Sequence, residues 1–206
     1  MKHEELFSKE RLKNFKDAKE HRDNFFFIQS LTVKIGVIEV ITRNKIYRVL
    51  KEKNKLYFLQ DKDKNEIIDY DNFVSQQTFG FWSNIINYAK IQNQILNLDR
   101  IDFRKYSPSN RKRKFTNYEK VSISYDLLKT IRNRAFHFEN LYKIRNISQQ
   151  NNIVMPRITT TRYKEIIGIM PKKIETFLND ILECLDDDLL EYCQNGGKKT
   201  KLPPLT

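Results

Sequence analysis

The stretch Leu127-Leu128-Lys129-Thr130-Ile131-Arg132-Asn133-Arg134-Ala135-Phe136-His137-Phe138-Glu139-Asn140 combines a helix-like apolar pattern with an Arg and a His five positions apart. At about 100° per residue, one sector of the helical wheel, about 100° wide, is apolar. That sector contains Leu127, Leu128, Ile131, Ala135 and Phe138. The opposite side carries Arg132, Asn133, Phe136 and His137. The pattern predicts one helix through the whole stretch, with the first set in the core and the second set facing outward.

The outward side of this predicted helix has the make-up of a functional surface. Asn133 and His137 are four positions apart, so the amide could hydrogen-bond the imidazole and fix its tautomer. Phe136 lies between Arg132 and His137 and points away from its own core. We therefore expect something to cover this face, either a second protomer or a stacked base. The plainer alternative is an ordinary exposed aromatic beside a surface histidine.

Charge and length limit the classes of partner. The 206 residues fit one domain with a real core, which we place at residues 1–195, followed by a flexible tail at 196–206. Lys and Arg (38) outnumber Asp and Glu (26), which gives a net charge of +12. Because the excess is spread along the chain, it favours nucleic acid over a membrane as the partner. The alternative is the Lys- and Asn-rich composition of an AT-rich genome.

The few cysteines and the N-terminal sequence indicate a cytoplasmic protein without a metal. Cys184 and Cys193 are nine residues apart, on opposite sides of the predicted last helix, so they should not form a disulfide. No Cys/His cluster has zinc spacing, so we expect no metal and no cofactor. The first residues lack the apolar core of a signal peptide, and no apolar run reaches the roughly 18 residues of a membrane span.

The remaining chain reads as helices with short irregular connections, since glycine and proline number only five each. Ser8 is a candidate N-cap for a first helix that extends to Ala18. Residues 31–50 favour one long helix by length, although their β-branched residues also fit a strand. Residues 57–68 predict a small inserted hairpin, and residues 73–91 predict another helix. A last helix should begin at Pro171 and end near Gly196-Gly197.

Two polar segments lie between the later helices. Residues 104–115 form a basic loop that contains four consecutive positive charges, Arg111, Lys112, Arg113 and Lys114. Such a run is either a solvated loop or a place where nucleic-acid phosphates bind. Residues 146–161 are rich in Asn, Gln and Thr and predict an irregular connection.

Three segments, taken in order, resemble motifs of the Abi-like (abortive infection) proteins. Residues 38–46 (IEVITRNKI) resemble their "LEV-x-x-RN-x-I" helix, and residues 78–82 (TFGFW) resemble their "SFGFW" segment. Residues 132–140 (RNRAFHFEN) resemble their "RN-R-x-x-H-x-E" segment, the R-x4-6-H signature of HEPN ribonucleases. The resemblance covers roughly residues 8–192. A departure is Phe136, since a small residue commonly precedes the His.

The resemblance implies an all-α HEPN-type bundle that forms a homodimer, with the two R-x4-6-H motifs meeting across a two-fold axis. It implies a metal-independent endoribonuclease of an antiphage abortive-infection or toxin–antitoxin system, regulated by a small RNA or a protein antitoxin. His137 would then transfer protons near neutral pH, and Arg132 would stabilise the charged phosphorane. Asn133 would orient His137, while Arg134 and the basic run would bind RNA. The expected products are a 2′,3′-cyclic phosphate and a 5′-hydroxyl.

Two other classes of function stay open at this point. A non-catalytic RNA-binding HEPN protein would use the same basic surface to hold a small RNA or a partner toxin. A DNA-binding regulator is disfavoured, because no glycine turn of a helix–turn–helix stands out in the sequence.

Overall fold

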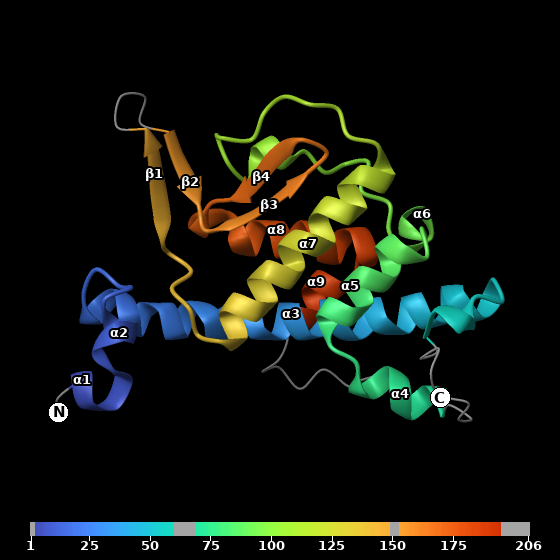
Figure 1. Cartoon of the computed structure of the whole chain (residues 1–206), viewed down its shortest axis with the longest axis horizontal. Coiled ribbons are helices and arrows are strands. Elements are labelled where there is room, and N and C mark those ends of the chain that lie inside the picture. The colour runs from blue at the N-terminus through green and yellow to red at the C-terminus, as the bar shows by residue number, and fades with distance from the viewer. Residues whose placement is uncertain (1–2, 60–68, 149–152, 195–206) are drawn as a thin grey trace.

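The computed structural model describes residues 3–59, 69–148 and 153–194. This part of the chain is mainly helical and contains two small antiparallel hairpins, so the all-α prediction is confirmed only as mainly α (Figure 1). The α-helices are α1 (His3–Phe7), α2 (Lys9–Leu12), α3 (Ala18–Glu52), α4 (Tyr70–Gln76), α5 (Phe79–Tyr88), α6 (Gln92–Ile95), α7 (Asn117–Phe136), α8 (Ile174–Leu185) and α9 (Leu189–Gln194). The 3-10 helices are η1 (Leu56–Leu59), η2 (Phe103–Lys105) and η3 (Pro171–Lys173). The strands are β1 (Ile144–Ser148), β2 (Ile153–Pro156), β3 (Ile158–Arg162) and β4 (Glu165–Ile169).

Helix α3 is the axis of the fold. It has 35 residues and is about 50 Å long at about 1.5 Å per residue. Asp17 is its N-cap, and the Asp17 carboxylate accepts the Glu20 N–H. Its inward face carries a row of buried apolar residues that includes Ile28, Leu31, Ile35, Ile38 and Ile46, with the buried Thr42 between the last two. The helix predicted for residues 31–50 is therefore confirmed. Packing overrides the strand preference of the β-branched residues, because helices α5, α7 and α8 all lie against this row (Figure 1).

Polar contacts fix the helices that pack on α3. The buried Tyr125 hydroxyl on α7 shares a 3.1 Å hydrogen bond with Thr42 on α3. The buried Lys34 pairs with Glu175 on α8 at 2.5 Å. Within the described residues, α3 is also the one helix long and apolar enough, by length and composition, to cross a membrane. In this structure one face of the helix packs in the core, and its outer face is exposed.

The two hairpins occupy a segment that the sequence predicts to be irregular. Strand β1 pairs with β2, and β3 pairs with β4 from Ile158 opposite Ile169 to Arg162 opposite Glu165. The irregular connection predicted for residues 146–161 is therefore wrong over the described residues. Hairpin β3–β4 packs on α7, where Asp126 accepts from Arg162 (2.5 Å) and from Thr160 (3.2 Å). No local sequence pattern predicts this tertiary contact.

Other predicted boundaries also need correction. The helix predicted for residues 73–91 is two helices, because Thr78 lies in an extended conformation and caps α5. Ser8 is an N-cap as predicted, but its helix α2 ends at Leu12. The predicted last helix divides into α8 and α9 after Leu185, so the two free cysteines lie on different helices. Residues 57–59 belong to η1 and not to a strand.

Some sequence predictions lie outside the described residues. They are the rest of the inserted hairpin at residues 60–68, the helix end near Gly196-Gly197 and the tail at residues 196–206.

Alanine substitutions at two glycines should have opposite effects on the free energy of unfolding. A Cβ on Gly168 of β4 would lie 2.6 Å from Cγ of Pro156, so Gly168→Ala should lower the free energy of unfolding by about 1–3 kcal/mol through overpacking. A Cβ on Gly36, within α3, would meet nothing within 4 Å. Gly36→Ala should therefore stabilise the helix by about 0.5–1 kcal/mol. Urea unfolding of both variants at low protein concentration tests the pair, and equal effects would contradict the packing described here.

Candidate active site at the end of helix α7

Helix α7 is fixed at both ends, which determines where its functional side chains lie. It begins with a capping box, in which Thr116 accepts the Glu119 N–H and the Glu119 carboxylate accepts the Thr116 N–H. It ends at Phe136, with His137 as the C-cap. The next two N–H groups donate back into the last turn, Phe138 to Ala135 O and Glu139 to Arg134 O, both at 2.9 Å. These two bonds form a Schellman motif.

Phe138 takes the left-handed position of this motif, with φ of 52°. Glycine is the usual residue there, because a side chain is strained in that region. The Phe138 ring stacks on Phe25 of α3 at a centroid distance of 5.2 Å, which offsets part of the strain. The prediction of a helix through residue 140 with Phe138 in its core stripe is therefore wrong: Phe138 lies beyond the helix and is 43% exposed.

Arg132 is held by a carboxylate from the central helix. Its Nε lies 3.2 Å from Oε2 of Glu39 on α3, and both side chains are mostly buried. Its guanidinium also lies over the Phe136 ring, 5.0 Å from the ring centroid. Phe136 itself is 45% exposed, so the predicted outward aromatic is confirmed. The contact joins the first and third of the sequence motifs, since Glu39 lies in one and Arg132 in the other.

His137 is exposed at the helix end. Its backbone N–H donates to Asn133 O at 3.0 Å. In the described part of the chain this backbone bond is the hydrogen bond that joins the two residues, so the predicted bond from the Asn133 amide to the imidazole is absent. The reason is that the helix ends at Phe136, which places His137 in the turn beyond it. The imidazole is accessible to a substrate or a second protomer.

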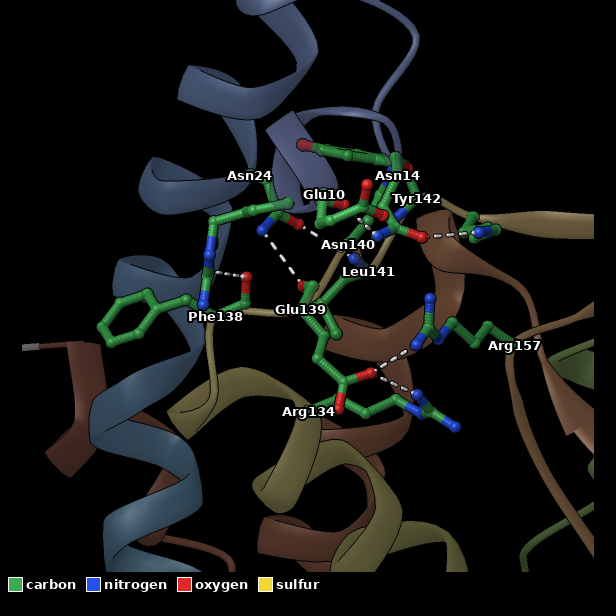
Figure 2. A network of polar contacts seen from close by, with 12 residues as sticks. Glu10, Asn14, Asn24, Arg134, Phe138, Glu139, Asn140, Leu141, Tyr142 and Arg157 are labelled. Carbon is green, nitrogen blue, oxygen red and sulfur yellow. Dashed lines mark hydrogen bonds and ion pairs between the residues drawn. The ribbon is translucent and has the colours of Figure 1, made fainter. Parts of the chain in front are cut away.

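Glu139 connects this turn to the hairpins. Its Oε2 accepts from Nη1 of Arg134 and from Nη2 of Arg157, each at 2.5 Å (Figure 2). Arg157 is the single residue between β2 and β3. Burial and then the neighbouring Arg134 charge lower the pKa of Arg157, while Glu139 opposes this shift. Two guanidinium groups therefore share one carboxylate, and the cluster retains a net positive charge.

The N-terminal segment closes the same turn from the other side. Asn24 of α3 donates to Glu139 O (3.1 Å) and accepts the Leu141 N–H (2.9 Å), and Asn140 donates to Asn14 O at 2.7 Å (Figure 2). Arg11 of α2 donates to Phe138 O at 3.1 Å. These bonds hold residues 138–141 rigidly against α2 and the start of α3.

A cavity of about 280 Å³ opens between these segments, and His137, Arg11 and Arg157 are among its lining residues. Arg132 lines a different, much smaller gap beside Ile35 and Glu39. The structure thus places Arg132 and His137 at the same helix end but not in the same cavity.

The predicted basic run lies far from this helix end. Residues 111–114 precede the N-terminus of α7, whose 20 residues extend about 30 Å. Arg113 is engaged in the fold: it donates to Tyr163 O and to Glu119 (3.1 Å) and lies over the Phe115 ring. Arg111 lines a separate cavity of about 790 Å³ between the hairpins. The structure does not bring Arg111, Lys112, Arg113 and Lys114 together with His137.

The sequence alone missed three residues around this helix end. Glu39 lies within a quoted motif, but no local signal indicates its pairing with Arg132. Arg157 lies in a segment read as irregular, and Arg11 lies in a helix with no motif. Only the tertiary fold places these side chains near α7.

The site is therefore an Arg/His pair at the end of a core helix, surrounded by further arginines. Among the described residues, no three His, Cys, Asp or Glu side chains come together in a way that could hold a metal ion. Comparisons with family models, with curated proteins and with solved structures find no match for this chain. The resemblance to Abi-like proteins therefore rests on the three sequence motifs alone.

Proposed function

We propose that this protein is a metal-independent endoribonuclease of the HEPN type that acts in the cytoplasm, in antiphage abortive infection or in a toxin–antitoxin system. The observation that carries the proposal is the pairing of Arg132 with Glu39 at the same helix end that exposes His137. A guanidinium held at Nε keeps its two terminal amino groups available for a phosphate. An accessible imidazole at the same helix end can transfer protons near neutral pH.

The chemistry follows from the 2′-hydroxyl of RNA. One imidazole accepts the 2′-hydroxyl proton as O2′ attacks the adjacent phosphorus. The P–O5′ bond then breaks, and a second acid protonates the leaving 5′-oxygen. Arg132 stabilises the doubly charged phosphorane through its planar fork of donors. The products are a 2′,3′-cyclic phosphate and a 5′-hydroxyl, and DNA is resistant because it lacks the attacking group.

This reaction needs a second proton-transfer group, and a homodimer would supply one as the His137 of the second copy. The outer face of α3 carries exposed apolar residues one heptad apart, Phe26, Val33 and Val40. The end of α7 lies beside this helix, since Arg132 contacts Glu39 and Phe138 stacks on Phe25. A second copy packed on this face would cover Phe136 and bring two His137 side chains together, as an isologous interface does. In such a dimer the two copies together would form one active site, whereas Arg132 and His137 of a single protomer line different cavities.

The test is incubation of the purified protein with end-labelled single-stranded RNA and, in parallel, DNA, each with and without EDTA. We expect cleavage of RNA alone, undiminished by EDTA, and fragments ending in a 2′,3′-cyclic phosphate. Loss of cleavage on chelation, restored by magnesium or manganese, would overturn the metal-independent mechanism. Tight RNA binding without any cleavage would favour the other class, a non-catalytic protein that holds a small RNA or a toxin.

A further inference from the structure

The cavity beside His137 has the composition of a phosphate-binding subsite. Arg157 and Arg11 line it from two sides, and neither belongs to the Arg/His motif. Arg11 comes from α2, and Arg157 comes from the corner between the two hairpins. Two segments more than 140 positions apart in the chain thus converge beside the histidine.

The cavity wall carries two arginines, Arg11 and Arg157, and two glutamates, Glu10 and Glu139, but both glutamates also pair with cations just outside the wall. Glu139 accepts from both Arg134 and Arg157 through one oxygen, so one of those two positive charges lacks a counter-charge. Arg11 donates to a neutral carbonyl, and within the described residues no carboxylate forms an ion pair with it. Glu10, also in the wall, pairs with Lys13 at 2.6 Å. With these neighbouring cations counted, the surroundings of the cavity carry a net positive charge that favours an anion.

The position of Arg157 leaves a donor available for that anion. One terminal nitrogen of its guanidinium bonds Glu139, and Figure 2 shows the other terminal nitrogen pointing away from that carboxylate. The Glu139 contact fixes the guanidinium plane, so the second nitrogen is pre-oriented. Phe15 and Phe138 form an apolar part of the cavity wall. The volume, near the lower end of the range of about 300–1,000 Å³ for small-ligand sites, suits one phosphate with its sugar.

We propose that Arg157 and Arg11 bind a backbone phosphate of single-stranded RNA next to the phosphate that His137 acts on. The inference rests on the proposed function, because His137 defines which polyanion enters the cavity. Arg157 and Arg11 would hold the strand, while Arg132 and His137 carry out the reaction. Glu139 would be the residue that positions Arg157.

The test measures the affinity of a fluorescent single-stranded RNA with 2′-O-methyl groups, which the protein cannot cleave, across a range of salt concentrations. Arg157→Gln should weaken binding about tenfold and lower the slope of log K against log salt by roughly 0.7, the value for one lost phosphate contact. Arg11→Gln should have the same effect. Arg157→Lys should retain most of the slope, because the positive charge remains.

Arg162→Gln is the matched control. It removes another partly buried arginine–carboxylate pair, with Asp126 at the same 2.5 Å distance, but Arg162 is not among the residues lining the cavity. Its melting temperature should fall about as much as that of Arg157→Gln, while its salt slope stays near the wild-type value. Equal slopes in wild type, Arg157→Gln and Arg162→Gln would overturn the subsite, as would equal losses in both variants.

The outcome does not depend on catalysis, because the probe is not cleaved. If the wild type cuts no RNA but Arg157→Gln still lowers the slope, the subsite stands and the endoribonuclease fails. If the wild type cuts RNA but Arg157→Gln leaves the salt slope unchanged, the endoribonuclease stands and the subsite fails. Single-stranded DNA of the same sequence should show the same loss, since the contact is to phosphate. A loss confined to RNA would overturn the phosphate assignment.

Discussion

Replacing His137 with alanine should lower the rate of RNA cleavage by at least about 10²-fold and leave the fold unchanged. The size of the effect follows from the loss of a general acid–base group, which contributes about 10²–10⁴ to the rate. The fold should survive because the imidazole is exposed and, within the described residues, makes no hydrogen bond to another side chain. Single-turnover cleavage and thermal unfolding measure the two halves of this prediction. Cleavage near the wild-type rate would remove His137 from the mechanism.

Mixed dimers extend the same prediction to the composite site. If both histidines act on one phosphate, a heterodimer of wild-type and His137→Ala chains should have far less than half of the wild-type activity. Differently tagged chains allow the heterodimer to be purified, and sedimentation gives the mass of the active species. Half activity in the heterodimer, or a fully active monomer, would contradict the two-fold arrangement.

Arg132→Ala should reduce cleavage by roughly 10²–10³-fold, the cost typical of losing one transition-state donor. Arg132→Lys should not restore it, because a single ammonium cannot replace a planar fork that bonds Glu39 and a phosphate at once. A kcat that falls with little change in KM would indicate an interaction made only in the transition state. A rise in KM alone would reduce Arg132 to a substrate-binding residue.

Glu39 variants show whether Glu39 acts by positioning Arg132 or through its own negative charge. Glu39→Gln keeps an oxygen that can accept from Arg132 Nε, so it should lose less activity than Glu39→Ala. In the Arg132→Ala background, neither change at Glu39 should lower activity further, because the group that Glu39 positions is gone. Additive losses would mean that Glu39 acts independently of Arg132.

Length and periodicity each anticipated part of the two longest helices. Length favoured a helix over residues 31–50, which form the later part of α3. The inward residues Leu127, Leu128 and Ile131 of α7 follow the 3.6-residue repeat and are buried. Periodicity could not place the end of α7, because Phe138 continues the pattern numerically although its backbone has left the helix. The deciding contact is the stack of Phe138 on Phe25, more than 100 residues earlier.

The hairpins and the position of Arg157 could not be predicted from the local sequence for a related reason. Strand β3 contains Thr159, Thr160 and Thr161, a polar run that resembles a loop until Thr160 meets Asp126 of α7. Arg157 acquires its role only when the two hairpins bring it to Glu139. The Arg/His motif can be found in the sequence because its residues are close together in the chain, whereas the residues around it come from distant segments.

The packing of α8 on α3 has a consequence for synthesis of the protein. The apolar row of α3 forms early in translation, but α8, which covers part of it and pairs with Lys34 through Glu175, emerges about 120 residues after the end of α3. Until then the apolar face of this long helix remains incompletely buried. The chain therefore depends on its last long helix to complete its core, and nascent chains that stop before α8 should be the ones that chaperones retain.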